Sequence, residues 1–331
     1  MLLTTFSRSR RLAILSSLAL AAVLGSASAS SQTWPAKPIK LIVPFPPGGA
    51  TDVVARTLGE RLQARLGQAV IIDNRPGAST AIGATAVAKA PPDGYTFLLS
   101  GLSTYSVLPA LKAQLPYDPR KELAPVAIVA RTPLVLVTGP AAPVKSLAEL
   151  IALAKSKPNE LTYSTFGPGS VSHLAGEMFA HEARVKLLAV PYKGGAPATM
   201  AAISGEVSFT IDTLASATPH IKAGKLRPLA IVGVSRVSTI PDVPTMAELN
   251  YPGSTLDSWY GIAAPAGTPS QIIEALSREL AQIVAQPEVK EKLLAIGVSA
   301  GFSDARAFST KAEAEMQMFS DVGKRANITL D

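Results

Sequence analysis

The sequence predicts an α/β protein built from two lobes. Apolar segments of strand length alternate with segments of helical periodicity, in two series that a long apolar strand at 126–137 joins. Short turns separate these segments, and glycine and proline, 24 and 27 of the 331 residues, mark many of them. This alternation is typical of βαβ units, in which helices cover both faces of a mostly parallel sheet. We therefore expect one such sheet in each lobe and a cleft between the lobes.

The first series alternates strands with amphipathic helices. Its helix at 52–66 carries Val53, Leu58, Leu62 and Leu66 at helical spacing beside charged residues. Such a helix buries one face against a sheet. The expected strands are 39–45, 69–73, 96–100 and 126–137, and the expected helices are 52–66, 80–90 and 105–113.

The second series begins at a capping box, Ser146-Leu147-Ala148-Glu149, which predicts a helix that ends near Lys155. Beyond it we expect strands at 161–166, 187–192, 207–211 and 226–232, and helices at 171–182, 197–203, 269–284, 287–296 and 304–325. Together the two series predict a discontinuous first lobe, residues 30–130 and 235–331, and a second lobe, residues 131–234.

Residues 1–29 have the pattern of a cleavable secretory signal peptide. Arg8, Arg10 and Arg11 precede an apolar run at 12–24, and Ala27-Ser28-Ala29 offers a cleavage site. The alternative, a retained membrane anchor, fits an apolar run of this length less well. The arginine pair leaves both Sec and twin-arginine export open. We expect the mature protein in the periplasm of a Gram-negative bacterium.

The composition excludes several kinds of site. Without cysteine the chain has no disulfide, thiolate metal site, cysteine nucleophile or lipoprotein anchor. The net charge of +7 contains the three arginines of the leader and no clustered basic run, so it does not indicate nucleic-acid binding. The three histidines lack metal-ligand spacing, and both G-x-G-x-x-G and the P-loop are absent. We expect neither a metal nor a cofactor.

Four turns, rich in glycine or small residues, join the end of a strand to the start of a helix. Main-chain amides at a helix N-terminus are unpaired and partially positive, so each turn is suited to an anion. The first turn offers Pro47, Gly48, Gly49, Thr51 and Asp52, although Thr51 or Asp52 alternatively serves only as a helix cap. The second offers Ala78, Ser79 and Thr80, or is an ordinary turn.

The third and fourth turns lie in the second series. In the third, Ser164 and Ser170 supply hydroxyl donors, and His173 is either a ligand contact or a neutral packing histidine. In the fourth, Tyr192 can stack on a ligand or hydrogen-bond to it. Asp212 follows the strand at 207–211 and accepts from a ligand ammonium, orients a water or caps the next helix. Four such turns in one chain predict a site for a small anion.

A set of motifs stands in order along the chain: Val43-Pro44-Phe45-Pro46-Pro47-Gly48-Gly49 with Asp52, Asn74-Arg75-Pro76-Gly77, Pro92-Asp93-Gly94-Tyr95, His173-Leu174-Ala175-Gly176-Glu177, Pro191-Tyr192-Lys193-Gly194 and Ala264-Pro265-Ala266-Gly267-Thr268-Pro269. Because of these motifs, the chain from Trp34 to its end resembles the Bug-type periplasmic receptors of tripartite tricarboxylate transporters. The resemblance implies a two-lobed type II periplasmic-binding fold, whose lobes close on one ligand.

The same resemblance implies a small carboxylate ligand, an organic acid or an amino acid, held by amides, hydroxyls and bridging waters. Its implied partner is an integral-membrane permease of the tripartite system. Two segments depart from many relatives. Ser79-Thr80-Ala81 stands where those relatives have a Gly-rich sequence, and Leu108 stands where they often have Asn. The identity of the ligand therefore stays open. Carried onto this chain, the contacts are Phe45 to Thr51, Ala78 to Ala81, Ser103, Thr104, Ser164, Ser170, His173, Tyr192 and Asp212.

Two other functions are alternatives. A ligand sensor would present its closed form to a membrane histidine kinase. A secreted serine hydrolase would use Ser170 or Ser172 with His173, but adjacent residues of a helix point in different directions. The sequence favours binding without catalysis, by a monomer that has no nucleic-acid partner.

Overall fold

The computed structural model describes residues 34–112, 114–233 and 235–326. The chain divides into two units, Met1–Ala36 and Lys37–Asp331. The fold is that of the second unit, and the signal peptide expected at 1–29 lies outside the described residues. Among the described helices, none combines the length and the apolar character needed to cross a membrane.

The first half of the fold is a sheet whose outer strands are parallel. Its strand order is β2–β1–β3, and β3 then pairs antiparallel with β9. The helix after β1 packs on β2 and buries Leu58 and Leu62 as the spacing predicts, together with Val54, whereas Val53 and Leu66 are only partly buried. The elements are β1 (Ile39–Val43), α2 (Ala50–Leu66), β2 (Val70–Asn74), η1 (Ala78–Thr80), α3 (Ala81–Ala88), β3 (Thr96–Gly101), the π-helical turn η2 (Ser103–Val107), α4 (Leu108–Leu111) and α5 (Pro119–Glu122).

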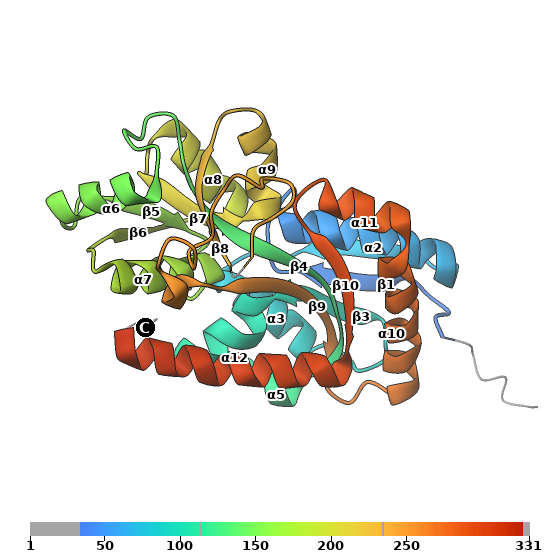
Figure 1. The fold of residues 1–331 in the computed structure, drawn as a ribbon. Helices are drawn as coiled ribbons and strands as arrows, with labels where there is room; N and C mark the ends of the chain where they lie inside the picture. Colours follow the sequence, from blue (N-terminus) through green and yellow to red (C-terminus); the bar gives the residue numbers. More distant parts are fainter. Residues whose placement is uncertain (1–33, 113, 234, 327–331) are drawn as a thin grey trace, which may run out of the picture. The chain divides into compact units, whose positions relative to one another are not determined.

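The strand β4 (Leu123–Thr138) runs from the first half of the fold into the second (Figure 1). Residues 123–133 pair antiparallel with β9 (Asp257–Pro265). Residues 134–138 pair antiparallel with β8 (Arg227–Val232), and 134–137 also with β7 (Phe209–Thr213). A single strand therefore belongs to both halves, as a crossing segment between two lobes must.

The second half repeats the α/β pattern. Strands β5 (Thr162–Thr165), β6 (Leu188–Pro191) and β7 are parallel. At the start of α6 the Ser146 hydroxyl accepts from the Glu149 amide at 3.2 Å, so the predicted cap is confirmed. The helices are α6 (Leu147–Ser156), α7 (Val171–Ala183), α8 (Gly195–Ser204) and α9 (Leu214–Lys222).

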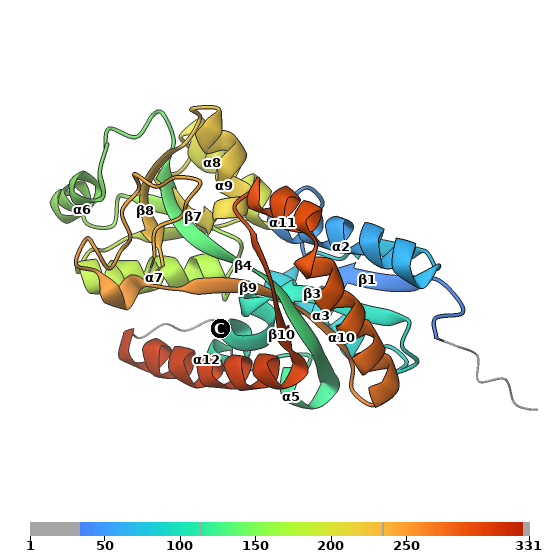
Figure 2. The same cartoon turned by 45° about the vertical axis from the view of Figure 1, so that its right-hand side comes forward.

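After β8 and the short η3 (Pro252–Ser254), the chain returns to the first half through β9. Helix α10 packs on β10, β4 and α2, while α12 packs on β4, η2 and α4 and also touches α7 (Figures 1 and 2). The final elements are α10 (Ser270–Ala285), α11 (Pro287–Leu294), β10 (Ser299–Asp304) and α12 (Ala305–Ala326).

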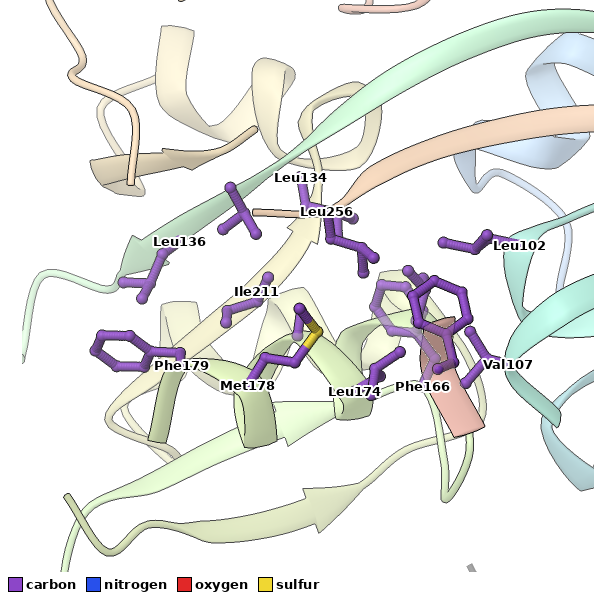
Figure 3. Close-up of a cluster of buried hydrophobic side chains, with 14 of the residues drawn as sticks. Leu102, Val107, Leu134, Leu136, Phe166, Leu174, Met178, Phe179, Ile211 and Leu256 are labelled. Atoms are coloured by element: carbon purple, nitrogen blue, oxygen red, sulfur yellow. The ribbon is translucent and has the colours of Figure 1, made fainter. Parts of the chain in front are cut away.

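A continuous apolar core links the two halves. Leu102 and Val107, from the segment after β3, face Phe166 and Leu174 of the second half (Figure 3). Leu102 and Phe166 also line a cavity between the halves, so this core reaches the candidate ligand site.

The structure confirms the α/β class and the two-lobed fold, but the strand pairing around β4 differs from the expected parallel sheet. Strands β7, β8, β9 and β10 all pair with β4 in the antiparallel sense. The pairing of β4 with β9 is antiparallel because these two strands cross between the halves in opposite directions. Strands β9 and β10 and helix α9 lie outside the predicted elements. Ser258, Tyr260 and Gly261 interrupt the apolar run of β9, and residues 214–222 do not show a helical pattern in the sequence.

Candidate ligand-binding site

Two cavities lie where residues of the two halves face each other. The first, of about 560 Å³, is lined by residues that include Thr51, Asp212 and Tyr260, and is called the Asp212 cavity below. The second, of about 680 Å³, is lined by residues that include Ser79 and Tyr192, and is called the Ser79 cavity. Both share Phe45, Pro46 and Phe166.

The Asp212 cavity collects the N-termini of helices from both halves. Ala50 and Thr51 begin α2, Val171 begins α7, and Gly195 and Ala196 begin α8. The N-cap residues of α2 and α8 are glycines, which provide no capping side chain. The first-turn amides of α2 and α8 thus lie beside the cavity without a side-chain cap, and their partial positive charge favours an anion.

No arginine, lysine or histidine lines this cavity among the described residues. Its ionisable groups are Asp212, an acid, and Tyr260. An anion in the cavity would therefore be held by amides and hydroxyls rather than by a cationic side chain.

Asp212 is the residue before the last of β7 and is fully buried. Its Oδ1 accepts from the Thr213 amide at 2.6 Å, and its Oδ2 accepts from the Thr199 hydroxyl. Burial raises the pKa of Asp212 to about 6, although hydrogen bonds from Thr199, Thr213 and Ser216 act in the opposite direction. A Cβ on Gly195 would lie only 3.3 Å from Asp212 Oδ1, so glycine lets the N-terminus of α8 approach the carboxyl group.

Tyr260 lies on β9, opposite Gly101 of β3. Its ring is buried, and its hydroxyl lies beside the hydroxyls of Thr51 and Thr213. Burial raises its pKa and the Asp212 carboxylate raises it further, while the hydroxyls of Thr213 and Thr51 lower it.

The floor of the Ser79 cavity is a strained turn. Ala78, Ser79 and Thr80 follow each other with φ of +46°, +53° and +94°, and such values are unusual for residues other than glycine. The hydroxyl of Thr104 donates to Thr80 Oγ1 at 2.8 Å and so fastens the turn to the segment after β3. Ser79 lines the cavity, and its Oγ lies next to Gly167 of the second half.

Three contacts cross between the halves around the cavities. The Val171 amide donates to Ser103 Oγ at 2.9 Å. A Cβ on Gly167 would lie 2.7 Å from Ser79 Oγ, and one on Gly194 would lie 2.8 Å from Pro46 Cδ. The halves are thus in contact around the cavities. Glycine stands at positions 167 and 194, where a larger residue would collide with a side chain of the other half.

The structure brings most of the candidate residues together. Those that line the Asp212 cavity are Phe45, Gly49, Thr51, Ser103 and Asp212. Those that line the Ser79 cavity are Phe45, Ala78, Ser79, Thr80, Ser170 and Tyr192.

The remaining candidates, Pro47, Gly48, Asp52, Thr104, Ser164 and His173, line neither cavity. Asp52 accepts from the Gly48 amide and from Arg56, both at 2.9 Å, and from Asn74, so it shapes the first turn. The Ser164 hydroxyl donates to the Ala198 carbonyl at 2.8 Å. Each of these two side chains is occupied inside the protein and positions the elements that carry the lining.

His173 supports the third turn from within the second half. Its Nδ1 accepts from the Gly169 amide at 3.3 Å, and burial lowers its pKa although Glu177 acts in the opposite direction. An imidazole that accepts at Nδ1 is neutral when its other nitrogen carries the proton. This geometry favours a neutral packing histidine over a ligand contact, the two alternatives that the sequence left open for His173.

Sequence reasoning missed part of the lining. It named neither Tyr260 and Ser258 of β9 nor Thr213 and Ser216 at the start of α9. The available signal was a run of polar and aromatic residues, Ser258-Trp259-Tyr260-Gly261, inside an otherwise apolar strand. No group of three or more potential metal ligands gathers among the described residues.

Two halves joined by crossing strands, with facing helix N-termini at the cavity between them, define a two-lobed solute-binding protein. The model of the tripartite tricarboxylate transporter family receptor matches residues 54–326, and the chain belongs to that family.

Known relatives agree in sequence and in fold. Protein BugT of Bordetella pertussis is 42% identical over 275 residues, which cover 83% of this chain and 84% of BugT. The structure of R. palustris Rpa4515 with adipate matches with a TM-score of 0.87 at 37% identity, over 89% of this chain and 99% of that one. MatC from Rhodopseudomonas palustris with bound malate matches with a TM-score of 0.84 at 31% identity, over 87% and 99%.

Proposed function

We propose that this protein is a periplasmic receptor that captures a small carboxylate by closure of its two lobes and delivers it to a membrane permease of the tripartite type. The observation that carries the proposal is the Asp212 cavity, where helix N-termini and hydroxyls from both halves converge without a basic side chain. Similar proteins with bound adipate and malate support a carboxylate as the ligand class.

The lining favours a carboxylate over a phosphate-sized ligand with several charges. The buried Asp212 repels a dense anion, and in the described residues no cation lines the cavity to compensate. Amides and hydroxyls can hold one carboxylate group, and the adjoining Ser79 cavity, which is lined by Lys193, has room for the rest of the molecule.

We assign the two lobes to residues 30–130 with 235–331 and to residues 131–234. Closure would act through β4 and the connection after β8, which cross between them. Binding promotes closure only if the ligand contacts both lobes in the closed state, and the lining of the Asp212 cavity meets this condition. We propose that the leader at 1–29 directs export and that the receptor acts as a monomer.

The protein is proposed to bind without catalysis. Ser170 Oγ accepts from the His173 amide at 3.3 Å and shares a hydrogen bond with Ser172. In the described structure no hydrogen bond joins the His173 ring to either serine, so His173 is not placed as their general base. A sensor function would use the same site but a different membrane partner, and family membership favours the permease.

Isothermal titration calorimetry of the chain from residue 30 onward tests the proposal. The panel contains mono-, di- and tricarboxylates, with inorganic phosphate as the anion control. We expect saturable binding of at least one carboxylate in the micromolar range and none of phosphate. Absence of carboxylate binding at millimolar concentration would contradict the proposal.

A further inference from the structure

The strained turn of the Ser79 cavity ends in a residue with an unfavourable backbone conformation. Thr80 has φ of +94° and ψ of −15°, and a β-branched residue rarely adopts a positive φ. Glycine would adopt this conformation without strain. Strain of this kind persists only where the surrounding structure stabilises it. Because Thr80 is only 2% exposed, the stabilising contacts of its side chain lie inside the protein.

Three further buried hydroxyl groups belong to the same hydrogen-bonded cluster as Thr80. The Thr104 hydroxyl donates to Thr80 Oγ1 at 2.8 Å and pairs with the Ser100 hydroxyl. The Thr80 side chain is also hydrogen-bonded to the Tyr117 hydroxyl. These four residues, called the hydroxyl cluster below, come from β3, η1, η2 and the segment before α5, and each is at most 3% exposed. Thr80 thus accepts from one cluster member and donates to another.

The hydroxyl cluster also holds the π-helical turn η2. The Tyr117 hydroxyl donates to the Thr104 carbonyl at 2.8 Å. This carbonyl depends on a donor from outside the turn, because the Leu108 amide donates to the Ser103 carbonyl and Pro109 has no N–H. Ser103, next to Thr104 in the chain, lines the Asp212 cavity, whereas Thr80 lines the Ser79 cavity. One buried cluster therefore holds wall segments of both cavities.

We infer that Thr104 and Tyr117 are positioning residues for ligand binding. Neither side chain lines the Asp212 cavity or the Ser79 cavity. They act through Thr80 and Ser103 and keep the walls of both cavities in the geometry that binds the ligand. A wall that leaves this geometry for part of the time lowers the apparent affinity by the same fraction. The inference rests on the proposed function and gives Thr104 a role other than direct ligand contact.

Thr104→Val tests the inference because it removes the hydroxyl and keeps the shape of the side chain. Calorimetry uses succinate, malate, adipate and citrate as probes. For the probe that the wild type binds most tightly, we expect a dissociation constant roughly 10-fold higher, as the loss of one buried hydrogen bond gives. Hydrogen–deuterium exchange of the ligand-free protein should be faster at residues 77–82. Thr104→Ser retains the hydroxyl and should restore both properties.

Thr268→Val is the matched control. It removes another buried threonine hydroxyl, which donates to the Pro265 carbonyl at 2.8 Å, and Thr268 lines neither cavity. This variant should lose stability in urea unfolding but keep wild-type affinity and wild-type exchange at residues 77–82. An equal loss of affinity in Thr268→Val and Thr104→Val would reduce the effect to general destabilisation and overturn the inference.

Substitutions of Thr80 separate the strain from the hydroxyl. Thr80→Ser keeps the hydroxyl, Thr80→Gly removes both the hydroxyl and the strain, and Thr80→Val removes the hydroxyl but keeps the strain. We expect affinity to fall in that order. In a chain that carries Thr80→Gly, Thr104→Val should change affinity less than about twofold, because its acceptor is gone. Tighter binding by Thr80→Val than by Thr80→Gly would indicate ligand contact with the side chain and overturn the inference.

The outcomes separate this inference from the proposed function. If the wild type binds none of the probes, the proposed function fails, and the role of the cluster in ligand binding fails with it. If the wild type binds a probe and the Thr104→Val protein binds it as tightly, only the inference fails. If Thr104→Val does not fold, Tyr117→Phe decides in the same way, since it removes one hydroxyl of the cluster from outside both cavities.

Discussion

Ser103 Oγ accepts a hydrogen bond of 2.9 Å from the main-chain amide of Val171. The bond connects the turn after β3, in the first half, with the first residue of α7, in the second. Both residues line the Asp212 cavity. Because the Ser103 hydroxyl serves here as acceptor, its own proton remains available to a ligand. One side chain therefore couples closure to ligand contact.

Removal of this bridge should weaken binding. In Ser103→Ala the buried Val171 amide loses its acceptor in the closed state, at a cost of about 1–3 kcal/mol. We expect calorimetry to give a dissociation constant about 10-fold higher. The control is Ser309→Ala, which removes a hydroxyl that donates to the Ala305 carbonyl within α12. Equal effects of the two substitutions would contradict the role given to Ser103.

Gly167→Ala should hinder closure. Gly167 has φ of +113°, and the added Cβ would lie 2.7 Å from Ser79 Oγ on the other half. We expect at least about a 10-fold loss of affinity, of which Ser79→Ala in the same chain restores a part. In Gly224→Ala, where φ is +68° and nothing lies within 4 Å of the new Cβ, only stability should fall, by about 1 kcal/mol. Full affinity in the Gly167→Ala protein would refute the crossing contact.

The carboxyl group of Asp212 should make stability depend on pH. Since its pKa rises from 3.8 to about 6 on folding, the folded state binds the proton more tightly than the unfolded chain. Its contribution to the free energy of unfolding is therefore largest in acid and declines as pH increases from 3.8 to about 6, by about 3 kcal/mol at most. Asp212→Asn should match the wild type at pH 4 and exceed it in stability at pH 7.

Urea unfolding at pH 4 to 7 measures this difference, with the exposed Asp242→Asn as the control. A constant difference between the Asp212→Asn protein and the wild type across this pH range would contradict the shifted titration.

Asp52 should be important for stability although it lines neither cavity. Asp52→Ala deprives the Gly48 amide, Arg56 and Asn74 of their acceptor. We expect a loss of about 2–3 kcal/mol in urea unfolding. Asp73→Ala removes the more exposed ion pair with Arg75 and should cost less than about 1 kcal/mol. Similar losses in both proteins would show that Asp52 is not a specific anchor of the first turn.

The sequence was sufficient to predict the position of those helices and strands whose buried residues follow a regular pattern. Helix α2 and the core part of β4 appear at the expected positions because one face, or the whole segment, is buried. Strand β9 was not predicted because its residues contribute both to the apolar core and to the polar lining of the cavity. Trp259 fills the core, whereas Ser258 and Tyr260 face the cavity, and these polar groups break the apolar pattern.

Turn composition predicted where the site lies but not which atoms line it. Thr51 and Asp52 are adjacent and chemically similar as caps, yet only Thr51 faces the cavity. The direction of Asp52 depends on Asn74 and Arg56, contacts that follow from the tertiary fold. The strain at Ser79 and Thr80 is equally invisible in sequence, since neither residue is expected at positive φ.

The distance between the two lobes, measured with and without ligand, tests carboxylate capture by closure most directly. The natural chain has no cysteine, so cysteines introduced at the exposed positions Gln63 of α2 and Lys155 of α6 accept spin labels at these two sites alone. Double electron–electron resonance should give a broad distribution without ligand and a shorter, narrower one when a carboxylate is bound. A distribution that stays unchanged while calorimetry records saturable carboxylate binding would contradict the account.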